Sequence, residues 1–185
     1  MVRWDGWLRY FTSRGVAVLR PNPRGSTGSG RAFVQDNACS WGDADVADVA
    51  AGIEAAGRSG WGDAARVAVA GGSSGGLTAL LVCARHGELV RAGVSAYGVT
   101  DLFDLARTTH RFESRYLDEV VGVLPAATAT FRDRSPVTHA AAIRVPLLVL
   151  QGDADVVVPP AQAQLLVDAV RAAGGRVVRI DAGAL

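Results

Sequence analysis

Two adjacent serines, Ser73 and Ser74, lie in the glycine-rich run Gly71-Gly72-Ser73-Ser74-Gly75-Gly76. The apolar segment Val67–Ala70 comes directly before this run and predicts a short strand, while Leu77–His86 comes directly after it and predicts a helix. A serine at a sharp strand-to-helix turn presents an exposed hydroxyl, which suits attack on a carbonyl carbon. Such a turn needs small residues two positions before and after the serine, because larger side chains would collide.

The spacing alone fits either serine, because Gly71-x-Ser73-x-Gly75 and Gly72-x-Ser74-x-Gly76 both satisfy the pattern. We prefer Ser73 as the nucleophile because it follows the strand more closely. This choice also leaves glycine at the second and third positions after the serine, where the helix packs against the strand. The alternative interpretation is a glycine-rich turn that binds nothing.

An acidic loop supplies candidates for a second catalytic group. The apolar segment Pro146–Gln151 predicts a buried strand, and Asp153 and Asp155 follow it. In parallel sheets the chemistry gathers at the carboxyl ends of the strands. A triad acid, which holds a histidine in one tautomer, follows the serine along the chain in hydrolases of this kind. Asp155 is the preferred acid and Asp153 the alternative, and either could instead be a turn aspartate.

Other polar segments give no clear sign of a catalytic or ligand-binding role. The loop Arg20–Gly30 lacks the spacing of a phosphate-binding loop, so we expect it to line the rim of a site or to form a surface turn. Asp43, Asp45 and Asp48 lie at a helix start, where acidic residues are expected from the helix dipole without any metal. The two cysteines lack metal-ligand spacing, and Cys83 is expected to be a reduced thiol in the core.

Short β-branched runs alternate with alanine-rich helical patterns along the whole chain. This alternation predicts an α/β fold with a mostly parallel sheet flanked by helices, and no linker divides residues 1–185 into more than one domain. The predicted strands are Val16–Leu19, Val67–Ala70, Ala92–Ser95, Pro146–Gln151 and Arg176–Ile180, and the predicted helices are Asp45–Ala56, Leu77–His86 and Pro160–Ala173. The stretch Thr100–Ala142 is less regular.

The composition excludes several classes of protein. The chain has 185 residues, 49% of them hydrophobic, and a net charge of +1, so nothing indicates a nucleic-acid or anionic membrane partner. No apolar run is long enough for a membrane helix, and Met1–Trp7 lacks the apolar core of a signal peptide. A cytoplasmic location is the expectation, and the oligomeric state stays open.

Several further segments, in order, resemble one family. Together with the serine turn they are Arg20-Pro21-Asn22-Pro23-Arg24-Gly25-Ser26-Thr27-Gly28, Trp41-Gly42-Asp43, Thr109-His110-Arg111-Phe112-Glu113-Ser114-Arg115-Tyr116-Leu117 and Gln151-Gly152-Asp153-Ala154-Asp155. The chain is similar to the catalytic domain of prolyl oligopeptidase family serine peptidases, in the acylaminoacyl-peptidase and dipeptidyl-peptidase-like branch. The resemblance implies an α/β-hydrolase fold, short peptide substrates and no metal or organic cofactor. It also implies that Ser73 is the nucleophile, the Ser74 N–H an oxyanion donor and Asp155 the triad acid.

The chain also departs from the family pattern. The family carries its catalytic histidine roughly thirty to forty residues after the acid, whereas all three histidines here, His86, His110 and His139, precede Asp155. We expect these three to be structural or surface residues. The family's oxyanion turn before the segment Phe11–Gly15 is also absent, so the domain is interpreted as incomplete at both termini.

Two main hypotheses follow from the matches and the departures. The chain is either a serine peptidase domain that acts through Ser73 or a catalytically inactive fragment, and an esterase of the same fold is a third alternative. For the substrate, Tyr97 and Phe103 are candidates for an apolar pocket, although aromatic residues at such positions also serve as core.

Overall fold

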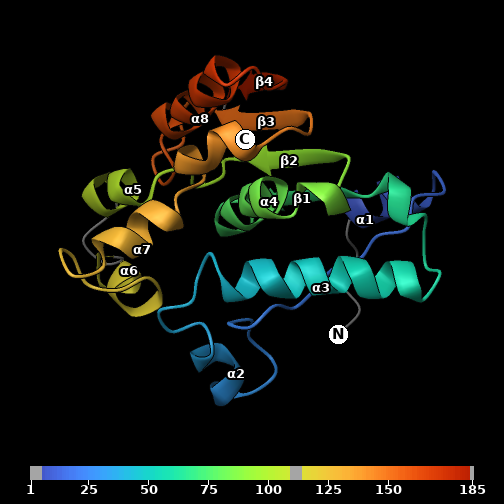
Figure 1. Ribbon diagram of the computed structural model, residues 1–185, viewed down its shortest axis with the longest axis horizontal. Coiled ribbons are helices and arrows are strands. Elements are labelled where there is room, and N and C mark those ends of the chain that lie inside the picture. Colours follow the sequence, from blue (N-terminus) through green and yellow to red (C-terminus); the bar gives the residue numbers. More distant parts are fainter. Residues whose placement is uncertain (1–5, 109–113, 184–185) are drawn as a thin grey trace.

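A sheet of four parallel strands in the order β1-β2-β3-β4 forms the centre of the computed structural model, which describes residues 6–108 and 114–183 (Figure 1). The strands are β1 Ala68–Gly72, β2 Ala92–Ala96, β3 Leu147–Gly152 and β4 Val177–Ala182. Each lies within two residues of a strand predicted from the sequence. Because all pairings are parallel, the carboxyl ends of the four strands lie at one edge of the sheet.

Helices surround this sheet, and three of them confirm the helices predicted from the sequence. The α-helices are α1 Gly6–Thr12, α2 Arg31–Gln35, α3 Ala44–Arg58, α4 Ser74–Arg85, α5 Leu102–Thr108, α6 Ser114–Val120, α7 Thr128–Asp133 and α8 Pro160–Ala172; the 3₁₀ turns are η1 Ala64–Arg66, η2 Gly87–Leu89 and η3 Pro136–Ala142. Helix α8 begins with proline, which needs no N–H there, and Gly174 follows its end at φ +77°. No helix in the described part of the chain is long and apolar enough to cross a membrane.

Helix α4, which follows the serine turn, is the central element of the core. Its residues from Gly76 to Cys83 are all buried, because the helix packs against β1 and β2 on one side and against α3 and η3 on the other. A helix that is apolar all round is typical of such a central position. The thiol of Cys83 is fully buried, which confirms the expected core thiol, and this burial raises its pKa to about 12.

The strand predicted at Val16–Leu19 is wrong. These residues form no strand, and the side chains of Val16, Val18 and Leu19 are exposed. The segment runs along α3, where Leu19 lies against Gly52. A β-branched run favours extended backbone, but it becomes a strand only where another strand supplies hydrogen bonds, and the described ladder of β1 is with β2 alone.

The stretch Thr100–Ala142, for which the sequence indicated no regular element, contains α5, α6, α7 and η3. These helical segments have six or seven residues each. That length is too short for a hydrophobic period to identify a helix. In Figure 1, α5, α6 and α7 lie together beside the end of the sheet, toward which the strand arrows point.

Candidate active site

Ser73 occupies a strained backbone conformation between β1 and α4, with φ +53° and ψ −122°. A non-glycine residue held there costs on the order of 1–3 kcal/mol, so the surrounding structure must hold it in place. The Ser73 N–H donates to the carbonyl oxygen of Ala96 at 3.0 Å, and its own carbonyl accepts from the Gly76 N–H at 2.9 Å. Ser74, by contrast, is the first residue of α4. Of the two adjacent serines, Ser73 alone has the backbone of a nucleophile elbow.

The glycines around Ser73 explain how the turn closes. A Cβ at Gly71 would lie 2.1 Å from the carbonyl oxygen of Gly75, so only glycine fits there, as the spacing argument predicts. A Cβ at Gly76 would lie 2.5 Å from the Cα of Gly98, where α4 crosses the loop after β2. A Cβ at Gly75 would meet nothing within 4 Å, so the expected collision at that position is wrong. On the helix side, Gly76 makes the close approach.

The Ser74 N–H lies at the amino end of α4. The first N–H groups of a helix have no partner within the helix, and they carry partial positive charge that favours an anion. A negative oxygen that develops next to Ser73 would therefore find a donor there. The assignment of this N–H as an oxyanion donor stays a prediction.

The loop after β3 fixes Asp155 and leaves one of its carboxylate oxygens available. The Oδ1 atom of Asp155 accepts from the N–H groups of Val157 and Val158, both at 2.9 Å. Its Oδ2 atom has no hydrogen bond to any residue in the described ranges. Asp155 is thus a turn aspartate that also has a free oxygen, which could hold an imidazole. Asp153 is exposed, and its backbone N–H donates to the Ala182 carbonyl at 3.1 Å.

A buried amide that the sequence did not single out closes this loop. Gln151, the fifth residue of β3, is fully buried, and its Nε2 donates to the Val158 carbonyl at 3.1 Å. This bond holds together the beginning and the end of the loop that carries Asp155. The position alternates with Leu147 and Val149 into the core, so the sequence pattern alone gives no signal of a polar role.

The strand order brings the candidate residues to one edge of the sheet. Ser73 follows β1, Tyr97 follows β2 and Asp155 lies in the loop after β3. Neighbouring strands lie about 4.8 Å apart, so β1 and β3 are roughly 10 Å apart with β2 between them. An imidazole-sized group could therefore lie between the serine and the acid at this edge.

Tyr97 and Phe103, the two candidates for a substrate pocket, lie in different surroundings. Tyr97 has φ +40°, is 39% exposed and places its ring beside Gly72, where a Cβ would be 3.0 Å from its hydroxyl oxygen. Phe103 packs in α5 against Phe131, with ring centroids 5.3 Å apart. The structure therefore brings Tyr97 to the serine turn, whereas Phe103 makes core contacts. A pocket role for either stays a prediction.

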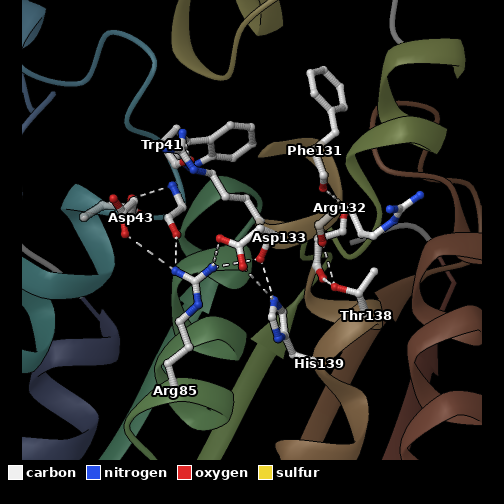
Figure 2. Close-up of polar contacts among 12 residues, drawn as sticks. Trp41, Asp43, Arg85, Phe131, Arg132, Asp133, Thr138 and His139 are labelled. Carbon is white, nitrogen blue, oxygen red and sulfur yellow. Dashed lines mark hydrogen bonds and ion pairs between the residues drawn. The ribbon is translucent and has the colours of Figure 1, made fainter. Parts of the chain in front are cut away.

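The two described histidines have other contacts. The Nε2 atom of His139 lies 2.5 Å from the Asp133 carbonyl oxygen, in a network where Arg85 also binds Asp133 and Gly42 (Figure 2). His86 caps the carboxyl end of α4 and lies 4.0 Å from Glu88. These contacts agree with the structural or surface roles expected for both residues. His110 lies outside the described residues.

Of the three aspartates at the start of α3, each has a protein partner. Asp45 is buried and accepts from the Gly42 N–H at 2.6 Å and from the hydroxyl of Thr78. Asp43 lies 3.7 Å from Arg85, and Asp48 pairs with Arg24 at 2.8 Å. Within residues 6–108 and 114–183, no group of histidine, cysteine and acidic side chains could hold a metal ion. Asp43 directly precedes α3 and Asp45 lies in its first turn, as the helix-start interpretation expects, whereas Asp48 lies one turn further along the helix.

Arg24 and Asp48 attach the loop Arg20–Gly30 to α3. The Arg24 guanidinium binds both carboxylate oxygens of Asp48, and the Arg24 N–H donates to the same carboxylate at 2.8 Å. The expected place of this loop at the rim of the site stays a prediction. The hydrogen bond from Arg24 is the main cause that lowers the pKa of Asp48.

This pKa shift predicts a pH-dependent contribution to stability. A carboxyl group with a lowered folded-state pKa stabilises the fold above its unfolded-state pKa of about 3.9, and this stabilisation is lost as the pH falls through the folded-state value. We expect the parent chain to need more urea for unfolding than the Asp48→Asn variant at pH 6, with a smaller difference at about pH 2. A difference that stays constant over this range would contradict the assignment.

Comparisons with known proteins place these features in context. A model described as the prolyl oligopeptidase family matches residues 4–182. The dipeptidyl aminopeptidase BIII of Pseudoxanthomonas mexicana is 29% identical over 174 residues, which cover 91% of this chain and 25% of that protein. The acylamino-acid-releasing enzyme of Sus scrofa is 32% identical over 165 residues, which cover 84% of this chain and 22% of that protein.

Solved structures of similar fold also include peptide- or puromycin-hydrolysing proteins. The crystal structure of a puromycin hydrolase superposes with a TM-score of 0.88 and 41% identity, covering 94% of this chain and 27% of the other. A puromycin-hydrolyzing peptidase of Mycobacterium tuberculosis has a TM-score of 0.88 and 38% identity, covering 93% and 26%. The chain therefore spans about a quarter of the length of the relatives and structures that it matches.

Proposed function

Because this chain belongs to the prolyl oligopeptidase family, we propose that it is a serine peptidase domain that hydrolyses short peptides by acyl transfer through Ser73. Its fold is the parallel sheet and flanking helices of α/β-hydrolase peptidases. The observation that carries the proposal is the φ of +53° at Ser73, at the turn from β1 into α4. A backbone held in strain at one hydroxyl is typical of a functional position.

In the proposed reaction the Ser73 Oγ attacks the carbonyl carbon of the substrate and forms a tetrahedral intermediate. A histidine takes the hydroxyl proton and then gives it to the leaving amine as the C–N bond breaks. The Ser74 N–H stabilises the negative oxygen of the intermediate. Water, activated by the same histidine, then hydrolyses the acyl-serine ester and restores the serine.

Asp155 would hold that histidine through its Oδ2 atom while the N–H groups of Val157 and Val158 fix its Oδ1 atom. No histidine follows Asp155 in the 185-residue sequence. In an assay of the chain by itself, added imidazole can take the place of the histidine side chain.

The names of the relatives guide the choice of substrate. One is a dipeptidyl aminopeptidase, another releases acylamino acids, and two solved neighbours hydrolyse puromycin. We propose that this chain acts on peptides or amides of one to a few residues. These names differ in whether the terminal amine of the substrate is free or acylated, so both kinds of substrate need to be assayed.

An assay with three substrates separates the hypotheses. The folded chain, with and without added imidazole, is mixed with an aminoacyl anilide, an N-acetylaminoacyl anilide and the matching p-nitrophenyl ester. We expect imidazole-dependent anilide hydrolysis that a fluorophosphonate abolishes. Hydrolysis of the ester alone would favour an esterase, and no reaction with any substrate would favour a catalytically inactive domain.

A further inference from the structure

The buried side chain of Gln162 joins α8, the helix that follows the Asp155 loop, to the loop after β2. Gln162 is the third residue of α8 and is 1% exposed. Its Oε1 atom accepts from the N–H groups of Thr100 and Asp101, at 2.8 and 2.9 Å. Its Nε2 atom donates to the Asp101 carbonyl at 3.0 Å and to the Asp104 carboxylate at 3.1 Å. Both polar atoms of the amide are thus used on one short segment.

Each end of this link is close to a candidate catalytic group along the chain. On the α8 side, the Gln162 N–H donates to the Pro159 carbonyl at 2.9 Å. Pro159 directly follows Val158, whose N–H donates to Asp155. The backbone of Gln162 is therefore attached to the end of the loop that fixes the proposed triad acid.

On the other side, the segment that Gln162 binds supports the serine turn. The N–H of Val99, next to Thr100, donates to the Ser73 carbonyl at 3.4 Å. Three residues earlier, the Ala96 carbonyl accepts from the Ser73 N–H at 3.0 Å. Gln162 therefore connects the segment that contacts the serine with the segment that contacts the acid.

The choice of an amide at this position has a physical reason. The next core positions of α8 are apolar, since Ala163 and Leu166 are buried beside Gln162. A leucine would fill the space, but it would leave the buried N–H of Thr100 and the partly buried N–H of Asp101 without their acceptor, which is costly. Only a side chain with both an acceptor and a donor satisfies this segment. The hydrogen bonds of Gln162 therefore fix the position of α8 relative to the segment Thr100–Asp104, which hydrophobic packing alone would not do.

We propose that Gln162 is a positioning residue that sets the place of Asp155 relative to Ser73 for the acyl-transfer reaction. This inference rests on the proposed function, because it concerns the alignment of the same two groups. A displacement of about 1 Å in such an arrangement can cost on the order of 100-fold in rate. Gln162 makes no contact with the reacting atoms in this proposal; it acts through the two loops.

The variant Gln162→Glu tests the link with little change of shape. The introduced carboxylate still accepts from Thr100 and Asp101, but it cannot donate to Asp104 and it repels that carboxylate. We expect fluorophosphonate labelling of Ser73, in the presence of imidazole, to slow by roughly 10–100-fold. The slowing should appear in the first-order labelling step, with little change in the probe concentration that gives half the maximal rate.

Two further readouts separate positioning from general destabilisation. The charged groups near the introduced carboxyl are Asp101, Asp104 and Arg107, which binds Asp104 at 3.1 Å. Below neutral pH the carboxyl becomes protonated and donates to Asp104, so the variant-to-parent rate ratio should rise as the pH falls. Adding Asp104→Asn, which supplies an amide donor, should restore part of the rate at neutral pH. Thermal unfolding establishes that all variants are folded.

The matched control is Gln164→Glu, on the same helix two residues later. Gln164 is exposed and binds Asp168 and Arg179, and its side chain makes no hydrogen bond to the described residues 97–108 after β2. We expect this variant to be labelled at the parent rate. Equal slowing in both variants would mean that a negative charge on α8 is the cause, and it would overturn the inference.

Amide hydrogen exchange tests the positioning role of Gln162 without relying on the reaction at Ser73. In Gln162→Glu the amides of Thr100, Asp101, Val157 and Val158 should exchange faster, whereas those of β1 should not change. If the parent is labelled at Ser73 and the variant is labelled equally fast, the positioning role is wrong while the proposed function stands. If the parent is not labelled even with imidazole, the proposed function fails and the positioning role fails with it.

Discussion

The Ser73→Ala variant will lose fluorophosphonate labelling, measured with added imidazole, by at least about 10⁵-fold, a loss typical of removing a catalytic serine. The Ser74→Ala variant will be labelled within about tenfold of the parent rate. The reason is the difference between the two backbones, because Ser73 has φ +53° at the turn whereas Ser74 begins α4. The Ser74 N–H, the proposed oxyanion donor, is retained in both variants.

A glycine at the same position separates the chemistry from the strain. Glycine adopts a positive φ at little cost, so Ser73→Gly should unfold at an equal or higher urea concentration than the parent, while labelling is lost. A variant that is more stable and inert cannot owe its inactivity to unfolding. If Ser74→Ala instead removes labelling and Ser73→Ala keeps it, the nucleophile has been assigned to the wrong serine.

The Asp155→Asn variant will show the second largest effect, a decrease on the order of 10²–10⁴ in the imidazole-dependent labelling rate. Asparagine keeps an oxygen that accepts from the N–H groups of Val157 and Val158, so the loop retains its conformation. What the substitution removes is the negative charge that orients an imidazole and stabilises its protonated form. The decrease is measured as the rate of fluorophosphonate labelling, from samples quenched at successive times, at several imidazole concentrations.

Asp153→Asn is the matched control for this prediction. Asp153 lies in the same loop, but its side chain is exposed and has no hydrogen bond within the described ranges. We expect its labelling rate to equal that of the parent. A larger loss in Asp153→Asn than in Asp155→Asn would exchange the roles of the two aspartates and would remove the basis for the positioning role of Gln162.

The sequence predicted the elements whose residues carry a local signal. The strand before Ser73 has alternating valines, and α8 begins with proline and ends before a glycine, so both positions follow from pattern and backbone chemistry. The serine turn was also predictable, because close packing at Gly71 leaves room only for glycine. These features depend on residues that are near one another in the chain.

The features that the sequence did not predict depend on contacts between distant segments. Val16–Leu19 has the composition of a strand, yet no described strand pairs with it. Gln162 resembles any polar residue of a helix until the fold places it against Thr100, 62 positions earlier. The open space at Gly75 also could not be predicted from the sequence. Only the path of α4 in the structure shows that Gly76, and not Gly75, approaches Gly98 closely. Tertiary packing decided each of these cases.

Localising the fluorophosphonate adduct on the parent chain tests the central claim most directly. The folded chain is labelled in the presence of imidazole, digested, and the peptide that contains both serines is fragmented in a mass spectrometer so that the adduct is assigned to one residue. The account predicts an adduct on Ser73 that depends on native folding. An adduct on Ser74, or no adduct on a chain with a cooperative unfolding transition, would contradict it.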